Sequence, residues 1–156
     1  MTLFATLPRL ALAGLAALAI AGCSIGGGGA LSPGLSAPMN LAGAKLNRVE
    51  ALFLLNDFRR NQGAADVRGD TVLDASAQTL AAAYAKTGAQ PSQPDGIRVM
   101  RVSAGYTNFA ETFSGWRNAP ADAAALADKS ATRAGLAVVY DPNSSYGVYW
   151  VLLLDD

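Results

Sequence analysis

The end of the chain, Tyr146–Leu154, is apolar almost throughout. A strand with one face in water alternates apolar and polar residues, whereas a strand buried on both faces shows a continuous apolar run. A second β-prone run, Ala134–Tyr140, comes before it, and the turn-forming segment Asp141–Ser145 separates the two. We therefore predict a hairpin whose second strand lies at the centre of a sheet covered on both faces.

The segments before this hairpin are mostly helical in pattern. A first helix is predicted over 41–62, because apolar residues recur there at three- and four-residue steps. Its expected buried face consists of Leu46, Val49, Phe53 and Leu54, widened by Leu52 and Leu55. One further strand is predicted over 97–102. Strands and helices thus mix without a regular βαβ alternation, which indicates an α+β fold with helices packed on an antiparallel sheet.

Three more helices are predicted over 75–87, 107–118 and 120–128. Asp70 or Asp74 is placed to cap the first of these. Its expected buried stripe consists of Ala77, Leu80, Ala81 and Tyr84. In the helix over 107–118, the expected buried side consists of Phe109, Phe113 and Trp116.

The N-terminus has the pattern of a targeting signal. An apolar run from Leu10 to Ala21 follows the single positive charge of Arg9 and leads into Cys23, the only cysteine of the chain. The run has the length of a signal-peptide core and is too short to span a bilayer as a helix. Its last four residues, Ile20–Cys23, resemble a bacterial lipobox, in which the thiol receives a diacylglycerol and cleavage occurs before the cysteine. The alternative is an ordinary secretory signal with a cysteine nearby by chance.

Three regions follow from this interpretation. Residues 1–22 are predicted to be a lipoprotein signal peptide, residues 23–40 the lipidated Cys23 with a Gly/Ser/Pro-rich flexible tether, and residues 41–156 a single domain. The residue after the cysteine is Ser24 rather than Asp, which in Gram-negative bacteria resembles the outer-membrane pattern. The predicted location is the bacterial cell envelope, at the outer membrane and facing the periplasm.

Composition excludes several kinds of chemistry. The 156-residue chain has a formal net charge of zero and no basic stripe, so nucleic-acid binding is not expected. It contains no histidine, which rules out Ser-His-Asp and Cys-His catalysis and any zinc site built on imidazole. Acylation of Cys23 would also remove the only thiol nucleophile.

Three blocks carry a family resemblance. They are Leu55-Asn56-Asp57-Phe58-Arg59 with Leu73–Gln78, then Gly105-Tyr106 with Trp116 and Asn118-Ala119-Pro120, and last Gly135–Tyr140 with Tyr149-Trp150-Val151. In this order and spacing they resemble the CAP superfamily, the SCP-like domain of cysteine-rich secretory proteins, antigen 5 and plant pathogenesis-related proteins. The resemblance implies a three-layer α-β-α sandwich around a central antiparallel sheet.

The same resemblance shows where this chain departs from the family. Many members hold two histidines and two acidic residues in a central cavity where divalent metal binds. Alignment on the blocks places Met100 and Arg101 where the family has Glu-Asn, and Asp122 where it has the second histidine. Glu111 is the candidate for the other acidic position. The resemblance therefore implies a metal-free member, and no cofactor is predicted.

The remaining candidates for a ligand groove are Arg101, Tyr106, Glu111, Trp116 and Asp122. The arginine suits an anionic head group and the aromatics an apolar or sugar ligand, although such aromatics also build cores. The first function class is a non-enzymatic, lipid-anchored module that binds a lipid, a glycan or another envelope protein. The second is a hydrolase that uses a cavity carboxylate or tyrosine, and the third is a structural lipoprotein contacting peptidoglycan or a partner protein.

Overall fold

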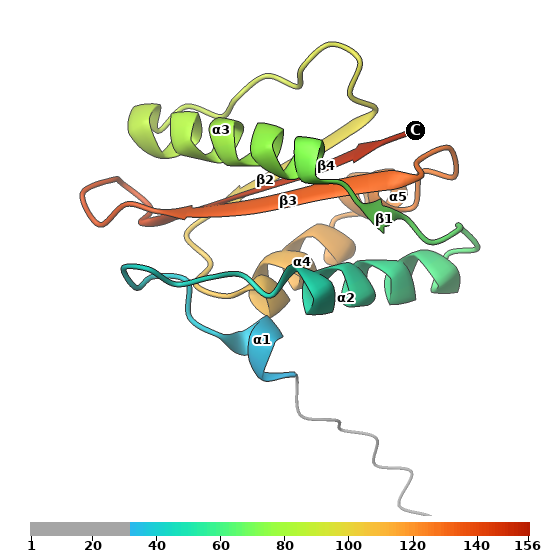
Figure 1. The fold of residues 1–156 in the computed structure, drawn as a ribbon, viewed down its shortest axis with the longest axis horizontal. Helices are drawn as coiled ribbons and strands as arrows, with labels where there is room; N and C mark the ends of the chain where they lie inside the picture. Colours follow the sequence, from blue (N-terminus) through green and yellow to red (C-terminus); the bar gives the residue numbers. More distant parts are fainter. Residues whose placement is uncertain (1–31) are drawn as a thin grey trace, which may run out of the picture.

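The computed structural model describes residues 32–156, so the predicted signal peptide and Cys23 lie outside the described residues. Five helices and four strands follow one another in this part of the chain (Figure 1). In order they are α1 (Pro33–Ser36), α2 (Arg48–Asn61), β1 (Arg68–Gly69), α3 (Thr71–Thr87), β2 (Val99–Ala104), α4 (Phe109–Asn118), α5 (Pro120–Leu126), β3 (Arg133–Tyr140) and β4 (Val148–Asp155). Within residues 32–156, none of the helices is long and apolar enough to cross a membrane.

The four strands form one sheet in the order β1-β3-β4-β2. β4 pairs antiparallel with both β3 and β2, and all eight of its residues are buried. The predicted hairpin and its central second strand are confirmed. The sheet is mixed rather than wholly antiparallel, because β1 pairs in parallel with β3. β1 was missed because a two-residue strand of exposed residues has no periodicity to detect.

The sheet is the middle layer of a three-layer sandwich, with α3 over one face and α2 and α4 over the other (Figure 1). Because side chains alternate along a strand, β4 supplies both cores. Val151 and Leu153 pack in a small cluster with Ala77 and Ala81 of α3. The larger cluster on the other face includes the remaining apolar side chains Val148, Trp150, Leu152 and Leu154. This double burial explains why the run lacks polar residues.

The first predicted helix is shorter than expected, and the set of side chains that it buries differs from the predicted one. It begins at Arg48 rather than at 41, and the Asn47 side chain caps it by accepting a hydrogen bond from the Glu50 amide. Val49 and Phe53 were predicted to be buried, but they are 79% and 68% exposed. The buried face consists of Ala51, Leu55, Asn56 and Arg59. The expected face was therefore partly confirmed, because Leu55 is buried and Leu46, Leu52 and Leu54 pack against the core. It was wrong for Val49 and Phe53, since the polar Asn56 and Arg59 of this helix are buried instead.

Part of the predicted tether packs against the domain. Residues 33–36 form α1, and Leu35 and Met39 are buried in the larger core cluster. The Met39 amide donates a hydrogen bond to the Thr107 carbonyl at 2.6 Å. The packed domain therefore extends further toward the N-terminus than residue 41.

Two helix starts show how local chemistry positions the elements. α3 begins four residues earlier than predicted, at Thr71, with Asp70 as its cap. The pKa of Asp70 lies below its usual range. The hydrogen bond from the Leu73 amide to the Asp70 carboxylate is the largest cause, and the hydrogen bond from the Val72 amide acts in the same direction. α4 begins behind the Asn108 cap, and its aromatic side is buried as predicted.

Candidate functional site

The structure brings two of the five predicted groove residues together. Arg101 of β2 and Asp122 of α5 form an ion pair, with the Arg101 Nε 3.0 Å from the Asp122 Oδ1. Both side chains are partly buried, with exposed fractions of 24% and 35%. The family resemblance aligns Asp122 with the second histidine of the metal-binding members and Arg101 with the asparagine of their Glu-Asn pair. In this chain the Arg101 guanidinium neutralises the Asp122 carboxylate.

The aromatic candidates serve the core and its edge. Trp116 is buried in the larger cluster, and its indole N–H donates to the Val102 carbonyl at 3.1 Å. Tyr106 is exposed, and its ring lies against Gly115 of α4. The Tyr106 carbonyl accepts a hydrogen bond from the buried Trp150 indole at 2.9 Å. Each buried indole N–H therefore has a hydrogen-bond acceptor. Trp116 links α4 to β2, and Trp150 links β4 to the loop between β2 and α4.

Glu111 lies apart from the Arg101–Asp122 pair. It is exposed in the first turn of α4, where it accepts a hydrogen bond from Thr107. It lines a groove of about 320 Å³ with Ser36, Leu54 and Arg117. Among the described residues, no group of three or more acidic or cysteine side chains is placed to hold a metal ion.

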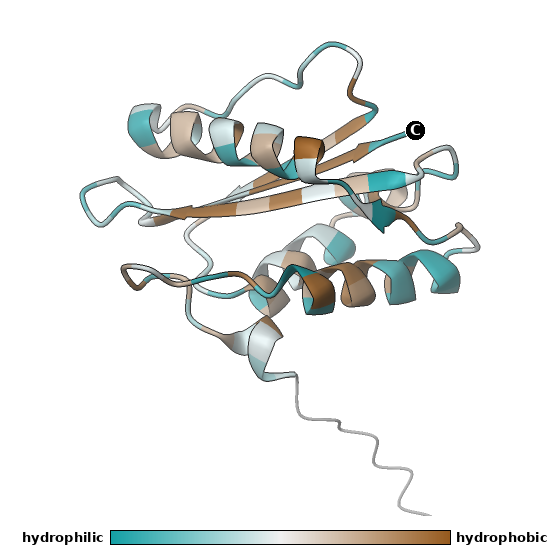
Figure 2. Ribbon diagram, viewed as in Figure 1, coloured by the Kyte–Doolittle hydropathy of each residue, from teal (hydrophilic) through white to brown (hydrophobic). Residues whose placement is uncertain are grey.

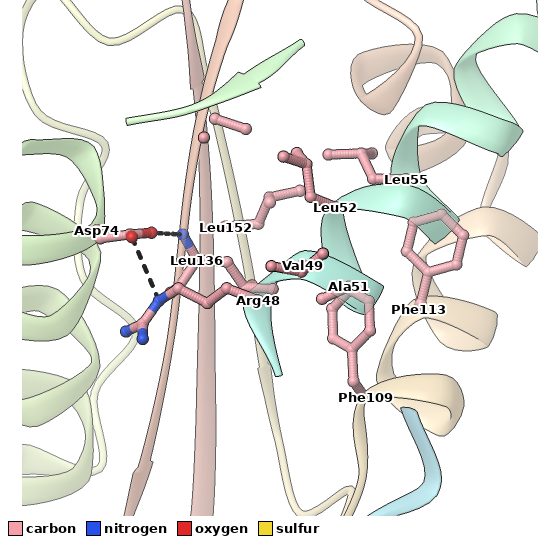
Figure 3. Close-up of a pocket in the computed structure, with 12 residues that line it drawn as sticks. Arg48, Val49, Ala51, Leu52, Leu55, Asp74, Phe109, Phe113, Leu136 and Leu152 are labelled. Atoms are coloured by element: carbon pink, nitrogen blue, oxygen red, sulfur yellow. Dashed lines mark hydrogen bonds and ion pairs between the residues drawn. The ribbon is translucent and has the colours of Figure 1, made fainter. Parts of the chain in front are cut away.

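Sequence reasoning missed an apolar pocket between α2 and the sheet (Figure 3). Its volume is about 160 Å³, and it opens to the surface. Side chains from α2, α3, α4, β3 and β4 line it, and nearly all of the lining is hydrocarbon. The lining residues are Arg48, Val49, Ala51, Leu52, Leu55, Gly69, Asp74, Phe109, Phe113, Ala134, Leu136 and Leu152.

The polar groups of this pocket are two charged side chains, Arg48 and Asp74 (Figure 3). The Arg48 Nε lies 3.3 Å from the Asp74 Oδ2 and donates to the Leu136 carbonyl at 2.9 Å. The Leu136 amide in turn donates to the Asp74 Oδ1 at 2.8 Å. The ion pair therefore holds α2 and α3 to the same residue of β3.

Two buried polar residues of α2 hold the pocket wall in place. The Asn56 amide group exchanges two hydrogen bonds of 2.9 Å with the backbone of Val67, the residue before β1. The Arg59 side chain is fully buried and donates to four backbone carbonyls. Burial lowers the pKa of Arg59, and the nearby Asp128 and Asp66 oppose that shift. The Leu-Asn-x-x-Arg block therefore has a structural role. Asn56 holds the segment before β1, and Arg59 holds the end of α5.

Comparison with known proteins shows which family has this architecture. The model of the cysteine-rich secretory protein family matches residues 52–154, more than half of the chain. The chain belongs to the CAP family. Within this CAP domain, the matched region contains the Arg101–Asp122 pair, the Asn56 and Arg59 contacts and most of the pocket lining.

Two solved structures of MpPR-1i share the fold of this CAP domain. MpPR-1i soaked with selenourea is 16% identical with a TM-score of 0.57, over 69% of this chain and 89% of that one. MpPR-1i itself is 17% identical with a TM-score of 0.53, over 69% and 85%. An outer surface protein from Borrelia burgdorferi is 15% identical with a TM-score of 0.49, over 72% and 98%. Among curated protein sequences, none matches this CAP protein.

Proposed function

We propose that this protein is a lipid-anchored bacterial envelope protein whose CAP domain is a non-enzymatic binding module for an apolar group. The observation that carries the proposal is the open hydrocarbon pocket between α2 and the sheet. Apolar cavities of about 150 Å³ in proteins hold a group the size of a benzene ring. The end of a single acyl chain has suitable chemistry and width, and each methylene that it buries contributes about 0.8 kcal/mol.

Binding is favoured over hydrolysis by the state of the charged groups. Acid–base catalysis needs a carboxylate or another titrating group free to exchange a proton with the substrate. Asp122 is paired with Arg101, and Asp74 is paired with Arg48 at the pocket. Glu111 lies in a different groove, and the sequence has no histidine to replace them. A purely structural role is the remaining alternative, and it predicts that nothing enters the pocket.

Pocket occupancy is tested with a fluorescent fatty acid and two matched variants of α2. Leu52 lines the pocket, whereas Leu54 lies on the same helix and lines the separate groove with Glu111. Both are half-buried. We expect Leu52→Asp to weaken probe binding at least tenfold, or about 1.4 kcal/mol, because it places a charge in the hydrocarbon wall. Leu54→Asp should change it less than about twofold. Equal loss in both variants, or no binding to the unchanged protein, argues against a ligand pocket.

The anchor is supported by the lone Cys23 at the end of an apolar run and by the family's secretory description. The test is to express the full chain and its Cys23→Ala variant in a lipoprotein-processing bacterium. The unchanged protein should carry an acyl mass at its N-terminus and partition into detergent, and the variant should lose both because it has no thiol to acylate. Unchanged membrane retention of the variant would contradict lipidation at Cys23.

A further inference from the structure

The exposed side of α2 carries an apolar patch made of Val49, Leu52 and Phe53. Val49 and Phe53 are one helical turn apart on the same face and largely exposed, and the half-buried Leu52 continues this face into the pocket. Figure 2 shows the N-terminal half of α2 as hydrophobic and its C-terminal half as hydrophilic. Single exposed apolar residues are ordinary. Here the exposed apolar residues adjoin an open hydrocarbon pocket, and contiguous apolar surface is where proteins contact partners or membranes.

The described chain starts beside this patch. The Ser32 hydroxyl donates a hydrogen bond to the Glu50 carboxylate, in the first turn of α2. Only residues 24–31 separate Ser32 from Cys23, so the two lie at most about 30 Å apart. A Gly-rich segment of this length typically spans about 17 Å. Whatever holds Cys23 therefore also lies close to the N-terminal half of α2.

Arginines border the patch. The Arg60 guanidinium lies 6.0 Å from the centre of the Phe53 ring and is paired with Asp57 and Asp66. Arg48, which precedes Val49, is paired with Asp74. Long arginine side chains lay their hydrocarbon stems along apolar surface while the charged ends reach polar groups. Because aspartates neutralise both arginines, contact of the patch with the boundary between acyl chains and head groups would rest on its apolar side chains.

We propose that the patch Val49, Leu52 and Phe53 lies on the bilayer that holds Cys23, so that the pocket opens into the membrane. This inference rests on the proposed anchor and adds the orientation of the domain and the source of its apolar ligand. The short tether makes docking effectively intramolecular, at a local concentration in the millimolar range. A patch of three side chains is then sufficient, although it would bind a membrane weakly by itself.

The experiment measures membrane depth at two positions of the full lipidated chain. Acylated Cys23 does not react with a thiol label, so a second cysteine can carry a nitroxide. Phe53→Cys places it on the patch, and Ala82→Cys places it at an exposed position of α3, across the sheet. In phosphatidylcholine–phosphatidylglycerol vesicles, we expect at least about a threefold higher ratio of oxygen to nickel-complex collisions at position 53, because oxygen concentrates in the hydrocarbon region.

Water-like collisions at both positions would overturn membrane docking. Spin–spin broadening at position 53 that grows with protein density would also overturn it, because a second copy of the chain then covers the patch. The intact mass of the same sample separates this failure from failure of the anchor. An acylated chain with a water-exposed position 53 contradicts only the docking, whereas a missing acyl mass contradicts the lipidation itself.

Discussion

Replacing Arg59 by methionine is expected to lower the free energy of unfolding by about 3–5 kcal/mol. The guanidinium donates to the carbonyls of Ala65, Leu126, Asp128 and Ala131 at distances of 2.7–3.2 Å. Methionine fills much of the same volume but donates no hydrogen bond. It therefore leaves several buried carbonyl oxygens without their partner, and each such loss costs about 1–3 kcal/mol before relaxation.

The adjacent Arg60 supplies the matched control. Its side chain is 46% exposed and pairs with Asp66 and Asp57 at the surface. The Arg60→Met variant should lose no more than about 1 kcal/mol, as is usual for exposed ion pairs. Urea unfolding followed by circular dichroism measures both variants. If the two lose the same stability, the carbonyl contacts of Arg59 do not have the importance that the structure indicates.

Replacing Gly135 by alanine is expected to cost about 3 kcal/mol or more, because α3 crosses β3 with no room for a side chain. A Cβ at this position would overlap the Leu73 carbonyl carbon and lie 2.5 Å from the Asp74 amide nitrogen. Both atoms are backbone at the start of α3, so rotation of a side chain gives no relief. We expect the helix to shift away from the sheet and the melting temperature to fall by roughly 10 °C.

Gly69 of β1 is the control for this substitution. A Cβ there would make an ordinary contact of 3.6 Å with the Leu52 Cδ2. Neither glycine has a positive φ, so alanine restricts the unfolded chain equally at the two positions. Thermal unfolding of Gly69→Ala should therefore stay within about 1 kcal/mol of the unchanged protein. A comparable fall in both variants would show that loss of glycine, rather than the close crossing, sets the stability.

The elements that could be predicted from the sequence are those whose packing follows from local pattern. The run at β4 lies between two apolar layers, so its composition alone indicates a central strand. The aromatic side of α4 recurs at helical spacing and is buried as expected. In each case the neighbours in the sequence also determine which face is buried.

The face of α2 depends instead on distant backbone groups. Arg59 is buried because carbonyls 67 to 72 residues away accept its hydrogen bonds. No pattern within the helix carries that information, so the apolar Val49 and Phe53 were assigned to the core in its place. The pocket has the same origin, because it is bounded by side chains from five elements that meet only in the folded chain.

The sequence indicated which residues belong to the candidate site, but not which of their side chains contact one another. The family resemblance singled out Arg101 and Asp122, and the structure shows that they form an ion pair. The sequence alone did not indicate that pairing, because two opposite charges 21 positions apart also suit a solvated surface. Glu111 was grouped with them by its spacing from Trp116, yet its helix presents it to another groove.

The ion pair of Arg48 and Asp74 has a consequence for crowding. Proteins held on a membrane share a thin layer, and an open sheet edge in such a layer is a template for pairing with a neighbour. β1 ends opposite Ala134, and two residues further along β3 both backbone groups of Leu136 are already engaged by this ion pair. A neighbouring strand can continue the ladder only by displacing both charges. At this point of the β3 edge, the sheet is therefore closed to pairing with a neighbouring molecule.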